Sequence, residues 1–197
     1  MMRQQGIDNK KDIMLLLLWS AGNRDQTNEP ISGRTRLVKG MFLFKYEALK
    51  HFSRGTAIND SNFYEFFAWN FGPFSTQVYD DLTFFLLRGF VEATTSDEEA
   101  LVESREEWER FVNETELAFD VNGAVDEYEE EKFSLTDRGM RWVESNLLPN
   151  LSGAQIDLLR TFKKKIQAPL RAILRYTYET YPSYTDKSII KEKVLHG

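Results

Sequence analysis

The chain has 197 residues, of which 42% are hydrophobic and 28% are charged, and its formal net charge is −6. This length and composition suit one well-packed core of ordinary size with an appendage. Because cysteine is absent, disulfides and thiolate metal sites are excluded, and a reducing, cytoplasmic location is expected. The apolar run at residues 13–19 is too short to span a membrane, so no membrane contact is expected except through a partner.

The negative charge is concentrated in one segment. Residues 96–132 hold 15 acidic and 3 basic residues, whereas the rest of the chain holds the other 16 acidic and 22 basic residues. The body of the protein is therefore mildly basic. The segment also contains Trp108 and Phe111, and it is apolar enough to fold on a surface. We interpret it as an ordered wing, or else as an acidic arm that contacts a basic partner or covers the protein's own basic face.

Two helices are predicted in the first 52 residues. The first runs through Ile13 to Ser20 and ends at Gly22, with Asp12 as its cap. After a polar connection, the second covers residues 33–52, where apolar positions recur at helical spacing. These positions are Leu37, Met41, Phe44, Ala48 and Phe52. The aromatic segment at residues 63–69 favours a strand over a short buried helix.

The chain is organised around a central helix that follows the turn at Gly72 and Pro73. Ser75 is the predicted N-cap, and apolar side chains follow at the three-and-four spacing that buries one helical face. These side chains are Val78, Leu82, Phe85, Leu86 and Phe90. Gly89 suits the end of this helix, and residues 90–94 then form a strand. This order is typical of the third helix and first wing strand of a winged helix-turn-helix.

The C-terminal part is predicted to be helical. Residues 132–136 form the returning wing strand, and Thr136 or Asp137 caps a helix that Pro149 closes. A long helix at residues 151–181, interrupted at Pro169, and a short one at 185–195 follow. The predicted fold is mainly α with a small β-wing. It comprises a winged-helix domain over residues 1–148, with the acidic wing inserted at about 96–132, and a C-terminal helical extension over residues 149–197.

Several motifs resemble the YwgA-like family of prokaryotic winged-helix proteins. They are SGRTRLVK (residues 32–39) before FLF (42–44), FGPFS (71–75), LLRGFV (86–91), FSLTDRG (133–139), and RYTYETYP (175–182) followed by Lys187 and Ser188. More distantly, the turn and the central helix are similar to the Panacea (SocA-like) antitoxin domain. The resemblance implies a winged-helix fold and a regulator or adaptor in bacterial or archaeal defence loci, such as antiviral defence. It implies no catalytic residues, and the long acidic wing departs from the family's pattern.

Five residues are candidates for contact with nucleic acid or another anion. Arg34, Arg36 and Lys39 place three cations at the opening of a helix, where the macrodipole disfavours cations and a bound anion would offset the penalty. Gln77 and Arg88 lie off the apolar face of the central helix and suit contact with a base or a phosphate. The alternative is that the three cations are solvated or pair with the acidic segment.

Contacts with a protein partner, or with a second copy of the chain, are predicted at two aromatic groups. Trp108 and Phe111 lie in the acidic segment. Tyr176, Tyr178 and Tyr181 lie near the C-terminus, where an aromatic helix face packs on the domain or on a second copy.

The sequence argues against an enzyme. Only His51 and His196 are available for histidine chemistry, and no Gly-rich loop ends in Lys-Ser or Lys-Thr, so no catalytic residue, metal, cofactor or small-molecule substrate is expected. A nuclease-like Glu-x-Lys match at residues 130–132 is expected by chance in so acidic a run. Two functions remain: a non-enzymatic adaptor or regulator acting through protein contacts in prokaryotic defence or a toxin–antitoxin system, and a sequence-specific DNA-binding transcriptional regulator. Asp80 and Asp81 favour the first, because carboxylates are repelled by phosphates.

Overall fold

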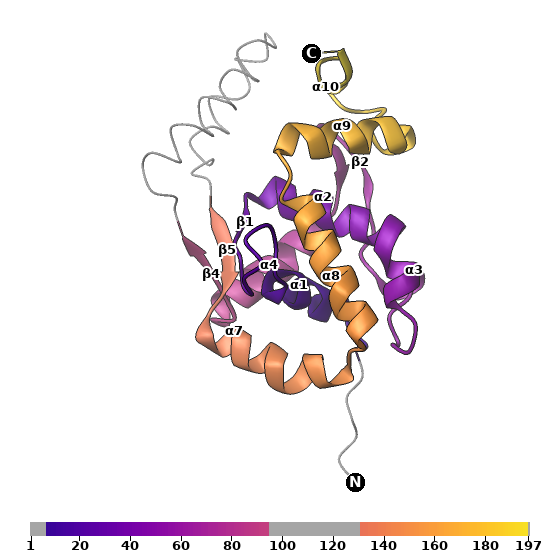
Figure 1. Cartoon of the computed structure of the whole chain (residues 1–197). Coiled ribbons are helices and arrows are strands. Elements are labelled where there is room, and N and C mark those ends of the chain that lie inside the picture. Colours follow the sequence, from indigo (N-terminus) through magenta and orange to yellow (C-terminus); the bar gives the residue numbers. More distant parts are fainter. Residues whose placement is uncertain (1–6, 95–130, 197) are drawn as a thin grey trace.

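The structure is a computed structural model that describes residues 7–94 and 131–196 (Figure 1). Most of the described residues are helical, and no helix among them is long and apolar enough to cross a membrane. The α-helices are α1 (Lys10–Trp19), α2 (Arg34–Leu43), α3 (Leu49–Phe52), α4 (Thr76–Leu87), α7 (Asp137–Trp142), α8 (Gly153–Ile166), α9 (Leu170–Thr180) and α10 (Lys191–His196). The other helical turns are η1 (Phe44–Ala48), η2 (Asp60–Asn62), η3 (Val143–Leu147), η4 (Leu148–Asn150) and η5 (Pro182–Tyr184).

Two small antiparallel sheets accompany these helices. The first contains β1 (Ile31–Ser32), β5 (Lys132–Leu135) and β4 (Val91–Thr94) in the order β1-β5-β4, with Val91 opposite Leu135. The second is a hairpin of β2 (Phe67–Trp69) and β3 (Gly72–Phe74). The prediction of a mainly helical fold with a small antiparallel sheet is confirmed, and β4 and β5 pair as the two predicted strands do.

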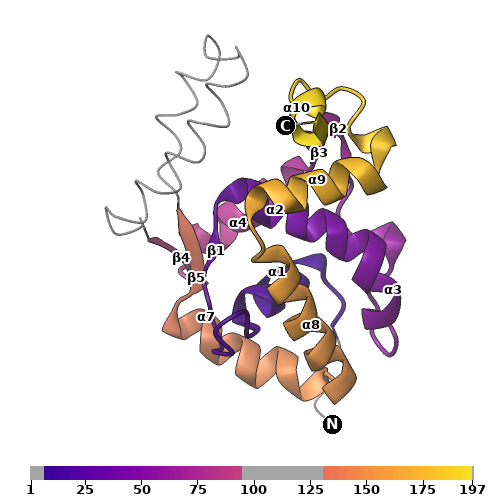
Figure 2. The ribbon, with the colours of Figure 1, turned by 45° about the horizontal axis from the view of Figure 1, so that its top comes forward.

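The core is built around α1. All six residues from Ile13 to Leu18 are buried, so this helix is apolar on every side and must be enclosed. Figure 2 shows α1 inside a ring formed by α2, α7 and α8, with the three-stranded sheet beside it. Lys163 of α8 is fully buried in this arrangement, and its Nζ donates hydrogen bonds to the carbonyl oxygens of Leu17 and Leu18, at 2.8 and 3.0 Å. An ammonium group thereby stabilises the negative end of the α1 dipole.

The second predicted helix is also confirmed, and its five stripe residues all face the core. They are Leu37, Met41, Phe44, Ala48 and Phe52. The helix is continuous from Arg34 to Phe52 but changes to π-helical hydrogen bonding at η1. A π-helical segment inserts an extra residue in the turn and so shifts the face that follows. The long helix predicted at residues 151–181 is interrupted as expected at Pro169, which precedes α9.

Several local expectations differ from the structure. The side chain of Asn9, not Asp12, accepts a hydrogen bond from the first turn of α1, because Asn9 has the extended backbone of an N-cap and Asp12 lies inside the helix. Ser75 is the N-cap of α4 by position, but its buried Oγ has no hydrogen-bond partner among the described residues. In the aromatic segment at residues 63–69, only β2 is extended in a sheet, while Phe63 and Tyr64 are buried before it.

Candidate interaction surface

The outward face of α4 is a row of small polar side chains with one large apolar residue. Thr76, Asp80, Thr83 and Leu87 recur at a spacing of three or four residues, so they share one face, and all four are exposed. Leu87 is 83% exposed. Among these four side chains there is one carboxylate and no cation. A helix that enters a phosphate-lined groove would meet repulsion at Asp80.

The side of α4 that faces α1 is occupied by polar contacts within the chain. Asp81, which the sequence placed with Asp80 on the outer surface, is buried and accepts a hydrogen bond from the Tyr64 hydroxyl at 3.0 Å. Lys11 forms an ion pair with the other oxygen of Asp81 at 3.0 Å. Burial, followed by the Asp81 carboxylate, raises the pKa of Tyr64 well above its usual range. Asp81 therefore stabilises the packing of α4 on α1 and does not contribute to the outer surface.

Gln77 has the same internal role. Its Oε1 accepts hydrogen bonds from Lys10 Nζ at 2.8 Å and from the backbone N–H of Glu65 at 3.2 Å. The Gln77 carbonyl therefore joins α4 to α1 and to the residues before the hairpin. In this structure that oxygen is engaged within the chain and does not face outward for base contact.

Two arginines lie over aromatic rings where the C-terminal end of α4 meets the start of α7. The guanidinium carbon of Arg88 lies 5.5 Å from the ring centre of Phe84, and that of Arg138 lies 4.5 Å from the ring centre of Phe90. Arg138 also donates a hydrogen bond to the carbonyl of Arg88 at 2.8 Å, and Phe90 packs edge-on against Trp142. We define the arginine–aromatic patch as Phe84, Leu87, Arg88, Phe90, Arg138 and Trp142.

An aromatic hairpin lies at the other end of α4. The rings of Phe67, Trp69 and Phe74 contact one another with centres 5.6–6.4 Å apart, and Tyr79 of α4 continues the row. Trp69 is 51% exposed although its ring is large and apolar. The tip of the hairpin is fixed, because the Asn70 carbonyl accepts hydrogen bonds from the backbone N–H of Ile189 and from the Ser188 hydroxyl. Exposed aromatic groups of this size are characteristic of contact surfaces.

The three cations predicted at the start of α2 have separate intramolecular partners. Arg34 forms an ion pair with Glu131, with Nε 2.7 Å from Oε2. Arg36 donates hydrogen bonds to the carbonyls of Ser32 and Ile166, both at 3.1 Å, and also to Ala168. A cation at the carbonyl end of α8 is favourable. The structure thus gives these side chains roles in folding.

Lys39 differs most from the expectation, because only 3% of it is exposed. Its Nζ donates a hydrogen bond to the Pro73 carbonyl at 2.7 Å, which fixes the hairpin against α2. Burial lowers the pKa of Lys39 to about 7. Because its ammonium does not reach solvent, Lys39 is not part of an exposed cationic surface in this structure.

The three predicted aromatic contact residues near the C-terminus differ in how far they are exposed. Tyr176 is 38% exposed and lies under the Lys165 ammonium, whereas Tyr178 is buried and its hydroxyl is 2.6 Å from Ser188 Oγ. Tyr181 is half-buried against the Phe42 ring. Tyr178 therefore packs within its own chain, in the core between α9 and α10, and is not available to a partner in this structure. Trp108 and Phe111 lie outside the described residues.

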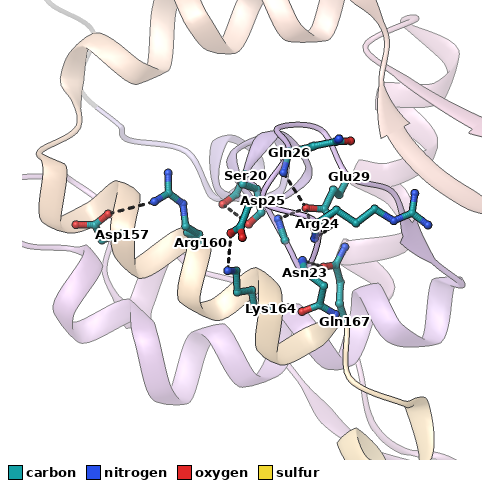
Figure 3. Close-up of polar contacts among 12 residues, drawn as sticks. Ser20, Asn23, Arg24, Asp25, Gln26, Glu29, Asp157, Arg160, Lys164 and Gln167 are labelled. Carbon is teal, nitrogen blue, oxygen red and sulfur yellow. Dashed lines mark hydrogen bonds and ion pairs between the residues drawn. The ribbon is translucent and has the colours of Figure 1, made fainter.

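The basic residues of α8 between Arg160 and Lys165 have acidic neighbours in the loop at residues 22–29 and within α8 itself, as Figure 3 shows. Lys164 forms an ion pair with Asp25 at 2.6 Å, and Arg160 lies 4.0 Å from Asp157. Next to them, the Glu29 carboxylate accepts backbone N–H groups of residues 22, 24 and 26. Burial alone would raise the pKa of Glu29, but these N–H groups lower it overall. The ion pair with Asp25 holds the loop on α8.

The patch residues Phe84, Leu87 and Trp142 were not expected as candidates. The available signal was that Phe84 and Leu87 are large apolar residues outside the buried stripe of α4.

Within residues 7–94 and 131–196, no group of three or more histidine, cysteine or acidic side chains could hold a metal ion. Comparisons of the chain with protein-family models, curated proteins and solved structures found no match.

Proposed function

We propose that this protein is a winged-helix adaptor or regulator that binds another protein through the outward face of α4. The order of elements supports the fold. Along the chain come α1, β1, α2, α4, β4 and β5, with α3 and the β2–β3 hairpin inserted between α2 and α4, and the sheet order is β1-β5-β4. In a winged helix this order makes α4 the third helix and β4 with β5 the wing. The resemblance to prokaryotic winged-helix families extends the proposal to a defence or toxin–antitoxin setting.

The observation that carries the proposal is the chemistry of α4's exposed side. Its central row offers Leu87 and a carboxylate where a DNA-reading helix needs cations and amide groups. Next to it, the arginine–aromatic patch combines arginine, tryptophan and phenylalanine, the residue types enriched at the centres of protein interfaces. Asp81 and Gln77 form hydrogen bonds within the chain, so they add neither charge nor an amide contact to the exposed side of α4.

Duplex binding tests the proposal against the alternative of a DNA-binding regulator. The full chain is titrated into a labelled random duplex and into its own upstream DNA, with salt varied from about 50 to 300 mM. We expect no affinity tighter than about 10⁻⁵ M at the lowest salt, because the outer row of α4 lacks cations. Tight binding of one duplex that weakens steeply with salt would overturn the proposal.

Two matched variants identify the surface if binding does occur. Arg34→Ala with Arg36→Ala removes two of the predicted phosphate contacts, and Arg54→Ala with Arg171→Ala removes the same charge from exposed positions elsewhere. A DNA-binding regulator would lose its affinity only in the first variant. Circular dichroism checks that the first variant is folded, since Arg36 bonds to the end of α8.

A further inference from the structure

We infer that the arginine–aromatic patch binds an acidic segment of the partner protein in which carboxylates flank a large apolar side chain. The inference rests on the proposed function and names the chemistry of the partner. It is carried by the geometry of the two arginines, by the exposed apolar side chains beside them, and by the charges around the patch.

The two guanidinium groups have ring partners but no carboxylate partner in the described part of the chain. Arg88 and Arg138 are exposed, and they contact the rings of Phe84 and Phe90 and one backbone carbonyl. By contrast, many other cations here pair with acids, as in Lys164 with Asp25. One Nη of Arg138 donates to the Arg88 carbonyl, but its other N–H groups and those of Arg88 can still donate to a carboxylate, a group that matches the guanidinium geometry.

The Arg138 side chain is also held in place before any partner arrives. Arg138 bonds to the Arg88 carbonyl and lies on the Phe90 ring, so two contacts restrict its side chain. Its helix, α7, begins at a Thr136 cap that accepts the N–H of Gly139 at 3.1 Å. A side chain that is already ordered loses less conformational entropy when it binds. The patch is therefore preorganised for a charged ligand.

The apolar part of the ligand is indicated by three exposed side chains. They are Phe84, Leu87 and Trp142. Phe84 lies four residues before Arg88 on α4, and Trp142 lies four residues after Arg138 on α7, so each of these two rings shares a helix face with one arginine. Trp142 is 41% exposed, and the rings of Phe84, Phe85, Phe90 and Trp142 form a continuous series of contacts. A leucine or tryptophan of the partner would cover apolar surface that water now contacts.

The surrounding charges favour a peptide over a nucleic acid. Glu92 lies two residues after Phe90, Asp137 precedes Arg138, and Asp80 lies on the outer row of α4, so three exposed carboxylates accompany the patch beside the exposed Arg141 of α7. A regular array of phosphates would meet repulsion at these carboxylates. A peptide can place one or two carboxylates on the arginines and direct neutral groups toward the acids.

Peptide binding to the full chain tests the inference. The probe is a fluorescein-labelled peptide of about twelve residues in which pairs of glutamates flank a leucine–tryptophan pair, and its controls replace the glutamates with glutamines or with lysines. We expect fluorescence anisotropy to report binding of the acidic peptide, and the Arg88→Gln, Arg138→Gln double variant to weaken it by about tenfold or more. Arg54→Gln with Arg171→Gln, the same charge change elsewhere, should leave the affinity within about twofold.

Three outcomes would overturn the inference. The acidic and glutamine peptides could bind equally, the two double variants could weaken binding equally, or a DNA duplex could displace the peptide from Arg88 and Arg138. In the first two cases the proposed function stands if the protein still ignores duplex DNA. In the third case both fail, because the patch would then be a nucleic-acid site.

Discussion

At the scale of single residues, two buried lysines stabilise contacts between elements that are far apart in the chain. Lys39 joins α2 to the hairpin through Pro73, and Lys163 joins α8 to the end of α1 through Leu17 and Leu18. Burial lowers the pKa of each to about 7, and for Lys163 the Glu29 carboxylate partly opposes that shift. Each ammonium has hydrogen-bond acceptors, but its charged form is still less favourable than in water, because one or two carbonyls replace its shell of water.

The pH dependence of stability should reveal Lys39. Its pKa is about 7 in the folded protein and near the ordinary 10.5 in the unfolded chain. Below pH 7 both states are protonated and the burial penalty is complete. Between pH 7 and 10.5 the unfolded chain binds more protons, so the free energy of unfolding rises with pH, by at most about 1.4 kcal/mol per pH unit for each such lysine.

Urea unfolding at pH 7.5 and 9.5 measures this rise. We expect Lys39→Met to lose part of the increase seen in the unaltered protein, whereas Lys50→Met, at an exposed lysine of α3, should keep it. Equal increases in the unaltered protein and in Lys39→Met would show that Lys39 does not titrate as its buried position requires.

At the scale of elements, the corner between α4, β4 and α7 sets the geometry of the arginine–aromatic patch. The Phe90 carbonyl accepts the backbone N–H of Thr136 at 3.1 Å, which joins the end of α4 to the start of α7. Gly139 of α7 lies directly against that carbonyl, and a Cβ atom there would be only 2.1 Å from the Phe90 oxygen. Arg138 and Trp142 therefore take their positions from a contact that only glycine permits.

Gly139→Ala should destabilise the protein by about 2–3 kcal/mol, because the backbone of Phe90 must move to admit the methyl group. Gly153→Ala is the control, since no atom lies within 4 Å of its added Cβ at the start of α8. The control should be neutral or more stable by up to about 1 kcal/mol, as alanine is the better helix former. Urea unfolding compares the two, and a Gly139→Ala protein as stable as the control would contradict this packing.

At the scale of the whole molecule, most helices and the β4–β5 pair could be predicted from the sequence, whereas β1, β3 and the polar partners of the side chains could not. The core-facing stripes of α2 and α4 recur with the period of a helix, so Met41 and Leu82 were placed correctly from local spacing alone. The partner of Lys164 is Asp25, 139 positions away, and no local pattern encodes such a pair. For this reason the cluster of Arg34, Arg36 and Lys39 in the sequence did not correspond to a cationic surface in the structure.

The candidate surface was predictable only in part. Phe84 and Leu87 stand outside the buried stripe of α4, so the helical period of the sequence is enough to mark them as exposed. Arg138 and Trp142 come from α7, and only the fold brings them beside Arg88. The buried position of Tyr178 depends in the same way on α10, which covers it from the end of the chain.

Photo-crosslinking from Thr83 tests most directly the claim that the outer face of α4 contacts protein. A photoreactive benzoylphenylalanine replaces Thr83 in the full chain, or Ala154 at the exposed start of α8 as the control, in the cells that produce the protein. The account predicts a discrete adduct from position 83 that protease removes and nuclease does not, and none from position 154. An adduct that nuclease removes, or the same protein adduct from both positions, would contradict it.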